Sequence, residues 1–196
     1  LHMLRGTHYV YQGEELGMTN SVFGGIDDYR DVEALRYYRE AVAAGEDPES
    51  VLAGMRATGR DNGRTPVQWD AGPNAGFTNG TPWIGVTPNY TEINAATQVG
   101  DPSSEYSYYR ALADIVIAAG SFERIVPPSP AVFAYRRTLD EAVATILVNL
   151  SSQPASLGEV ARGVSGELIL SNRDLSEAER EAPGVLEPWE ARVYLA

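Results

Sequence analysis

The residues best suited to chemistry lie close together between Arg60 and Trp69. This stretch, RDNGRTPVQW, combines two arginines, a carboxylate, two amides and an indole within ten residues. Sugars are bound by such a mixture, because Arg and Asp hydrogen-bond adjacent hydroxyls and an aromatic face packs against the apolar side of the ring. On composition alone, the simpler interpretation is a loop in which Arg and Asp pair with each other and Trp69 belongs to the core.

Paired carboxylates are a second candidate, since two carboxyl groups about 5 to 9.5 Å apart carry out glycoside hydrolysis. Glu14 and Glu15 follow a predicted strand. Adjacent residues on an extended chain point in opposite directions, so the two would not face one substrate. We expect one to pair with an Arg and the other to be solvated. The four acids between Asp27 and Glu33 equally fit solvated loop charge and compensation of a helix dipole.

Several classes of site are excluded by what the sequence lacks. There is no Cys, and His2 and His8 are the only histidines. The sequence therefore predicts no disulfide, no Cys nucleophile and no zinc site. It contains no P-loop, no nucleophile elbow and no dinucleotide-binding glycine pattern. We expect neither a metal nor a cofactor.

The charge balance bears on partners and location. The 196 residues include 15 Lys and Arg against 27 Asp and Glu, a formal net charge of -12. Nucleic acid and membranes are not expected as partners, because polyanions are bound by basic faces. The longest mostly apolar stretch, residues 111–119, is far below the roughly 20 residues of a bilayer span. No signal-peptide pattern precedes Leu1, and we expect a cytoplasmic location.

The first half of the chain predicts one strand, two helices and a long loop. Residues 7–11 (THYVY) predict a short buried strand. A helix should begin after Asp31 as N-cap and end at Gly45, and Pro48 should open a second helix. Residues 60–98 are rich in Gly, Pro and Asn, and we expect a functional ordered loop there. Its expected apolar anchors are Trp69, Phe77, Trp83, Ile84 and Tyr90.

The second half predicts one more helix and then strands. Asp101 should cap a helix that has Pro102 at its first position and runs to about Ala119. The boundary of an antiparallel all-β module should lie between Gly120 and Pro130, where a cluster of prolines begins. Its predicted strands are residues 131–137, 141–150, 166–172 and 190–196, with a turn at Leu139 and Asp140.

Four stretches carry a resemblance to a known family. They are GTHYVYQGEELGMTN (6–20), RDNGRTPVQWD (60–70), AGFTNGTPWIGVTPNY (75–90) and EARVY (190–194). Together and in this order they resemble family 13 glycoside hydrolases, in the branch of the oligo-1,6-glucosidases, α-glucosidases, dextran glucosidases and sucrose isomerases. The resemblance extends over essentially the whole chain.

The resemblance implies an α+β fragment of a larger enzyme. Residues 1–121 would be the last strand, long loop and helices of a (β/α)8 barrel, and residues 122–196 an antiparallel β-sandwich. In this family the three catalytic carboxylates follow barrel strands four, five and seven, and the calcium-binding loop also lies upstream. No catalytic residue is therefore assigned here, and we expect the chain alone to be inactive. The missing N-terminal barrel portion is the expected partner, and unpaired strand edges would favour self-association.

The resemblance also implies roles for six residues. Arg60 matches the Arg that hydrogen-bonds the non-reducing glucose in subsite −1, and Glu33 matches a Glu near subsite +1, although a structural role for Glu33 is equally open. Four more residues match positions that shape or brace the pocket: Gln12, Glu14, Asp61 and Arg64.

The implied activity is that of a retaining α-glucosidase acting on a neutral gluco-oligosaccharide or sucrose-like disaccharide. Hydrolysis, isomerisation and transfer all occur within the branch. Two alternatives from other classes are a non-catalytic β-sandwich module that binds glycan or stabilises the barrel, and a relative of the amino-acid transporter heavy chains.

Overall fold

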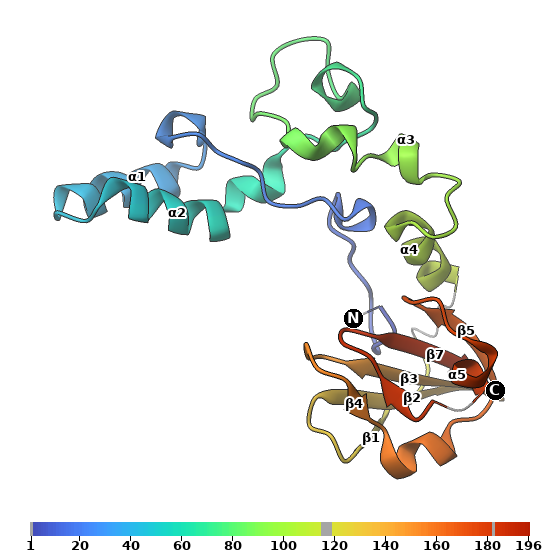
Figure 1. The fold of residues 1–196 in the computed structure, drawn as a ribbon. Helices are drawn as coiled ribbons and strands as arrows, with labels where there is room; N and C mark the ends of the chain where they lie inside the picture. Colours follow the sequence, from blue (N-terminus) through green and yellow to red (C-terminus); the bar gives the residue numbers. More distant parts are fainter. Residues whose placement is uncertain (1, 115–118, 182) are drawn as a thin grey trace. The chain divides into compact units, whose positions relative to one another are not determined.

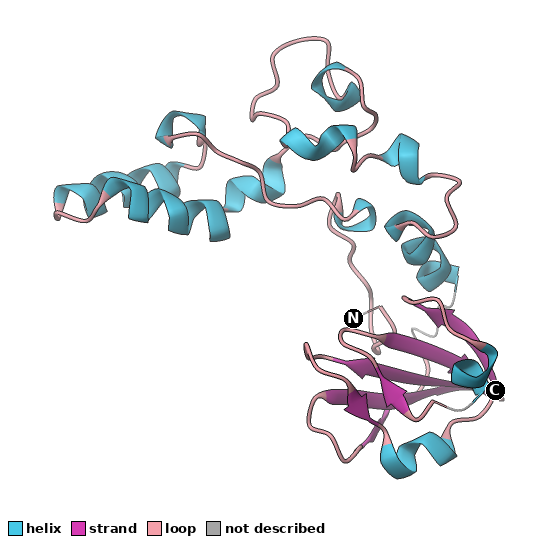
Figure 2. Ribbon diagram, in the orientation of Figure 1, coloured by secondary structure: helices cyan, strands magenta, loops and turns pink. Residues whose placement is uncertain are grey.

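The structure, a computed structural model, describes residues 2–114, 119–181 and 183–196 (Figure 1). The chain forms two compact units, one of Val10–Tyr109 and one of Leu1–Tyr9 together with Arg110–Ala196. The first unit consists of helices and loops, and the described strands belong to the second (Figure 2). None of the described helices is long and apolar enough to cross a membrane.

Two helices packed side by side dominate the first unit. They are α1 (Val32–Ala43) and α2 (Pro48–Thr58). Asp31 caps α1 by accepting a backbone N–H of the first turn at 3.0 Å, and Asp47 caps α2 in the same way at 2.9 Å. Pro48 occupies the first turn of α2, where its missing N–H costs nothing. Both predicted helices and the predicted cap are confirmed.

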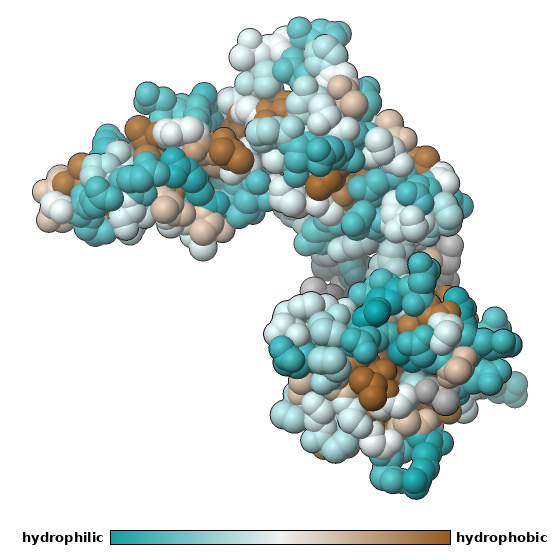
Figure 3. Space-filling model, viewed as in Figure 1, coloured by the Kyte–Doolittle hydropathy of each residue, from teal (hydrophilic) through white to brown (hydrophobic). Residues whose placement is uncertain are grey.

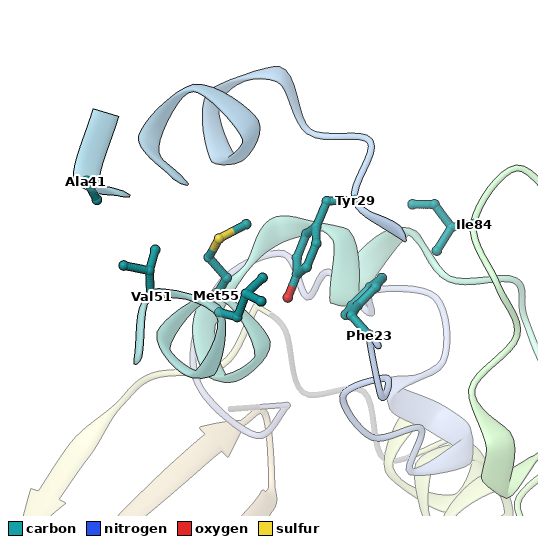
Figure 4. Close-up of a cluster of buried hydrophobic side chains, with 7 residues drawn as sticks. Phe23, Tyr29, Ala41, Val51, Met55 and Ile84 are labelled. Atoms are coloured by element: carbon teal, nitrogen blue, oxygen red, sulfur yellow. The ribbon is translucent and has the colours of Figure 1, made fainter. Parts of the chain in front are cut away.

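A hydrophobic cluster holds this helix pair against neighbouring loops (Figure 4). Phe23 and Tyr29 stack, with ring centroids 4.5 Å apart and planes inclined by 27°. The helices contribute Ala41, Val51, Leu52 and Met55, and the long loop contributes Ile84. Burial of these side chains stabilises the unit by removing apolar surface from water.

The long loop of residues 60–98 has little regular structure, as predicted. It contains three 3-10 turns, Arg60–Arg64, Pro73–Gly76 and Pro88–Thr91, and one turn of helix, α3 (Ala95–Gln98). The predicted apolar anchoring is wrong for three of its five residues, since the rings of Trp69, Phe77 and Trp83 are exposed. Ile84 is buried and Tyr90 is partly buried.

Buried polar side chains fix the long loop instead. Gln68 is fully buried and donates to the carbonyl of Ile93. Asn94, also fully buried, caps α3, and Gln98 donates to the carbonyl of Leu16 at 2.7 Å. A stretch rich in Gly, Pro and Asn has few apolar side chains to bury, so side-chain amides satisfy its backbone groups.

The next helix, α4 (Glu105–Asp114), begins later than predicted. Asp101 does not cap it, because its carboxylate closes a local turn by accepting the N–H of Ser103 at 2.8 Å. Ser104 is the cap, and its hydroxyl oxygen accepts a backbone N–H of the first helical turn at 3.2 Å. The predicted continuation to residue 119 passes through residues 115–118, which lie outside the described residues.

The predicted strand at residues 7–11 is wrong. These residues do not form a strand, and Tyr9 exposes 87% of its surface. The described strands pair only with one another and supply no neighbour for this segment. A β-branched and aromatic sequence favours a strand only where a second strand takes up its N–H and C=O groups, and the described chain offers none.

The second unit is built on a five-stranded antiparallel sheet with the order β1-β2-β3-β7-β5. Its strands are β1 (Glu123–Ile125), β2 (Val132–Leu139), β3 (Ala142–Asn149), β5 (Glu167–Ser171) and β7 (Ala191–Leu195). A separate pair consists of β4 (Ala155–Ser156) and β6 (Val185–Leu186), and a short helix, α5 (Glu177–Glu181), precedes β6. The four predicted strands are confirmed, whereas β1, β4 and β6 are too short to show an alternating pattern.

Alternating side chains give the large sheet two buried faces. One face includes Ala134, Leu147 and Tyr194, which pack against Leu157 and Leu186 of the β4–β6 side. The opposite face includes Tyr135, Ala144, Ile146 and Val193 and is covered by Met3. Hydrophobic side chains still reach the surface in separate places on the face drawn in Figure 3.

Two buried arginines tie the second unit together. Arg192 and Glu190, both from the EARVY stretch, form a buried ion pair at 2.6 Å. Arg192 also donates to the carbonyl of Glu179 at 2.7 Å. Arg137 donates to the carbonyl of Met3 at 2.7 Å and so holds the N-terminal residues on the sheet. A buried charge is tolerated only when partners such as these surround it.

Replacing Glu190 with Ala should lower the free energy of unfolding by about 3 to 5 kcal/mol, because the guanidinium of Arg192 would remain buried without its carboxylate. Urea unfolding of the 196-residue chain, followed by its strand signal, measures the change. The matched control is Glu159→Ala, which breaks the exposed pair of Glu159 and Arg162 at 2.6 Å and should leave stability nearly unchanged. Equal effects of the two substitutions would contradict the prediction.

Candidate functional site

The candidate site is built around a buried carboxylate, that of Asp61. The 3-10 turn Arg60–Arg64 carries it, and its side chain is fully buried. Its Oδ2 accepts the backbone N–H of Arg30 at 2.8 Å and that of Asp31 at 3.0 Å. Its Oδ1 accepts Nη1 of Arg64 at 3.1 Å. Asp61 thereby fixes the backbone at the start of α1.

Asp31 and Arg60 form the central ion pair of the site. Oδ2 of Asp31 accepts Nε of Arg60 at 2.6 Å, and Oδ1 accepts Nη2 at 2.9 Å, so the contact is bidentate. Nη2 also donates to Oε2 of Glu33 at 3.1 Å. The Asp31 side chain is only 6% exposed, whereas that of Arg60 is 58% exposed. The exposed guanidinium of Arg60 is thus held by the almost buried carboxylate of Asp31.

The Arg60 guanidinium retains donors for a ligand. The two carboxylates occupy its Nε and Nη2, and Nη1 has no hydrogen-bond acceptor among the residues that the structure describes. A guanidinium carries five N–H donors in a planar fork, and two of them belong to Nη1. The two N–H groups of this one planar nitrogen point in different directions, so they suit two separate acceptors such as two hydroxyl oxygens.

The ion pair keeps both groups charged. The hydrogen bond from Arg60 lowers the pKa of Asp31 against the opposing effect of burial, and the N–H of Glu33 and the charge of Arg64 lower it further. Nη1 of Arg64 lies 3.6 Å from Asp31. The same hydrogen bond raises the pKa of Arg60. Asp31 is therefore an anion at neutral pH and does not act as a proton donor.

The structure brings together four of the six predicted site residues. Arg60, Glu33, Asp61 and Arg64 belong to one network of hydrogen bonds and ion pairs with Asp31. The composition of residues 60–69 predicts a loop in which Arg and Asp pair with each other, and Arg64 and Asp61 do so. The partner of Arg60 is instead Asp31, which lies outside this stretch.

Gln12 and Glu14 lie outside that network. Gln12 is exposed, and Glu14 accepts the N–H of Tyr11 at 3.2 Å. The segment still contacts the site, because the Tyr11 hydroxyl donates to the carbonyl of Gly63 at 2.8 Å. Within the described residues, neither Gln12 nor Glu14 has a hydrogen bond or ion pair with the arginines of the Arg60–Arg64 turn, although their segment contacts that turn through Tyr11.

The carboxylates of Glu14 and Glu15 both accept backbone N–H groups of their own segment. Glu15 accepts the N–H of Gly13 at 2.9 Å, so each carboxylate folds back onto its own backbone. The expectation that one of them pairs with an Arg is wrong within the described residues. Both turn back because the 3-10 turn Glu14–Leu16 follows Gly13, whose φ of 90° is favoured only for glycine.

The sequence identified Asp31 as a helix cap and missed its pairing with Arg60. The two residues are 29 positions apart, and their contact depends on how the chain returns after α2. One feature of the sequence does indicate a cationic partner. Asp31 and Glu33 place two carboxylates at one helix end, and a nearby cation reduces the repulsion between them.

Known proteins similar to this chain belong to one family. The sequence model of the family "alpha amylase, catalytic domain" matches residues 1–118. An oligo-1,6-glucosidase of Parageobacillus thermoglucosidasius is 45% identical over 99% of this chain and 36% of its own length. A trehalose-6-phosphate hydrolase of Escherichia coli is 40% identical over 100% of this chain and 36% of its own length. The crystal structure of the trehalulose synthase MutB from Pseudomonas mesoacidophila matches 97% of this chain and 36% of its own, with 38% identity and a TM-score of 0.84.

These matches agree on one class of protein, that of the α-amylase catalytic domain, over residues 1–118. The chain belongs to the α-amylase family, within the branch of the oligo-1,6-glucosidases and sucrose isomerases. It spans about a third of the length of the relatives that it matches.

Replacing Asp31 with Asn should remove part of the acid sensitivity of the chain. The pKa of Asp31 is below its usual 3.8 in the folded state, so in acid the unfolded chain binds the extra proton. The ion pair therefore stabilises the fold fully above about pH 4, and this contribution is lost as pH falls through the lower folded pKa. Asn preserves the helix cap.

Urea unfolding between about pH 5 and pH 2, followed by the helical signal, measures this effect. The wild-type chain should lose more stability over that range than the variant. Two curves that fall in parallel would show that the charge of Asp31 does not stabilise the fold.

Proposed function

We propose that the chain is part of a retaining α-glucosidase that acts on a short neutral α-glucoside, an oligosaccharide or a sucrose-like disaccharide. The observation that carries the proposal is the Arg60 guanidinium, held by Asp31 and Glu33 with Nη1 left for a ligand. The family to which the chain belongs also supports an α-glucosidase activity. Two of the relatives that the chain matches are an oligo-1,6-glucosidase and a trehalose-6-phosphate hydrolase. A MutB structure has also been solved with its substrate sucrose.

Four roles follow for the six site residues in the whole enzyme. Arg60 hydrogen-bonds the glucose unit, so that binding energy from hydroxyls away from the reacting carbon supports the chemistry. Asp61 and Arg64 brace the turn that carries Arg60, and Glu33 lies at the edge of the site, where a leaving group can contact it. Gln12 and Glu14 shape the neighbouring wall.

The rest of the enzyme would complete both the barrel and the reaction. Residues 1–121 contribute the end of a (β/α)8 barrel, and residues 122–196 form a β-sandwich in which the β4–β6 pair covers one face of the large sheet. The segment of residues 7–11, which forms no strand in this chain, would gain two neighbouring strands in the whole barrel. An Asp nucleophile and a Glu acid/base would come from the upstream barrel strands and carry out the double displacement.

Replacing Arg60 with Ala in the full-length enzyme should lower kcat/KM by at least about a hundredfold, because the charge-assisted contacts to the sugar are lost. Release of p-nitrophenol from a p-nitrophenyl α-glucoside measures the rate. Arg36→Ala is the matched control, since Arg36 is an exposed arginine of α1 that lies 3.8 Å from Glu40 and outside the site. Wild-type kinetics in the Arg60 variant would exclude a substrate contact.

The 196-residue chain alone should be inactive, because the family's three carboxylates are expected upstream of it. The purified chain is incubated with a p-nitrophenyl α-glucoside and compared with buffer. Glucose released above the buffer rate, and retained through a second purification step, would contradict this prediction.

A further inference from the structure

We infer that Asp31 is the positioning residue of Arg60: its carboxylate holds the Nε and Nη2 edge of the guanidinium and so presents Nη1 to the hydroxyls of the sugar. This inference rests on the proposed function, in which Arg60 contacts the substrate. Asp31 itself touches no ligand and takes no part in bond breaking.

The first support is the fixation of Asp31. Its backbone N–H is bound by the buried carboxylate of Asp61 at 3.0 Å, and its own Oδ1 accepts the N–H of Glu33 at 3.0 Å. Nη1 of Arg64 lies 3.6 Å from Oδ2 of Asp31, and the side chain of Asp31 is only 6% exposed. Both its backbone and its side chain are therefore held, and the carboxylate has one orientation to offer.

The second support is the edge of Arg60 that is occupied. A bidentate contact through Nε and Nη2 sets the plane of the guanidinium as well as its position, whereas a single contact would leave the plane free to rotate. Arg60 is otherwise a long side chain that is 58% exposed and would sample many rotamers in water. Holding it in place before the sugar arrives reduces the entropy lost on binding.

The third support is the contrast between Asp31 and Glu33. Glu33 makes one contact with Arg60, at 3.1 Å, and its side chain is 74% exposed. An exposed side chain with one hydrogen bond to the guanidinium does not fix the guanidinium plane. The positioning role therefore belongs to Asp31, and Glu33 remains free to adjust when a ligand binds.

Asp31→Asn in the full-length enzyme tests the inference. Asn keeps the helix cap but loses the charge and one of the two acceptor oxygens that face Arg60. We expect kcat/KM on a p-nitrophenyl α-glucoside to fall roughly tenfold to a hundredfold, since small misplacements of a binding group cost that much. The matched control is Asp47→Asn at the cap of α2, which has no arginine partner among the described residues and should change the rate by less than about twofold.

The double variant separates positioning from a general structural effect. If Asp31 acts through Arg60, Asp31→Asn has no further effect in an Arg60→Ala enzyme. Multiplying losses, a wild-type rate for Asp31→Asn, or an equal loss for Asp47→Asn would each overturn the inference. A wild-type rate for Arg60→Ala would instead overturn the proposed substrate contact, so the two failures are distinct.

A second substitution keeps the test decisive if Asp31→Asn does not fold. Arg60→Lys retains the charge but has one nitrogen, which cannot bind the carboxylate and present a second nitrogen to the sugar. We expect a loss as large as that of Arg60→Ala. A rate close to that of wild type would show that the orientation set by Asp31 is not required.

Discussion

The buried charge of Asp61 is the constraint on which the candidate site depends. A carboxylate with no exposed surface is costly unless each oxygen is hydrogen-bonded. Asp61 meets this requirement with two backbone N–H groups at the start of α1 and with Arg64. The turn after α2 and the beginning of α1 are consequently locked together, and the Asp31–Arg60 pair forms at that junction.

The local chain path makes this junction possible. Gly59 ends α2, and a Cβ there would lie 2.5 Å from the carbonyl oxygen of Met55. Only glycine lets the chain leave the helix so close to its last turn. Arg60 directly follows Gly59, so the position of its backbone is fixed by the end of α2. Asp31 then needs to constrain only the side chain of Arg60.

Local patterns predicted the parts of the fold that depend on neighbouring residues. The two helices, the Asp31 cap and the four longer strands follow from periodicity and capping chemistry. Residues 7–11 failed because a strand needs a partner, and the anchors of the long loop failed because amides such as Gln68 took the buried positions. The site residues came from resemblance, and the partner of Arg60 came only from the structure, since no local pattern encodes a contact across 29 residues.

The polar anchoring of residues 60–98 has a thermal consequence. Gln68 and Asn94 are fully buried, whereas Trp69 and Phe77 remain in water in the folded chain. Ile84 is the one large apolar side chain that the described part of this loop buries, so local opening would expose less apolar surface per residue than opening of the sheet, and its heat-capacity change per residue would be smaller. The free energy of opening this loop should then curve less with temperature than that of an apolar core. Hydrogen exchange in this loop would accelerate steadily on warming, while exchange in the sheet follows a curved profile.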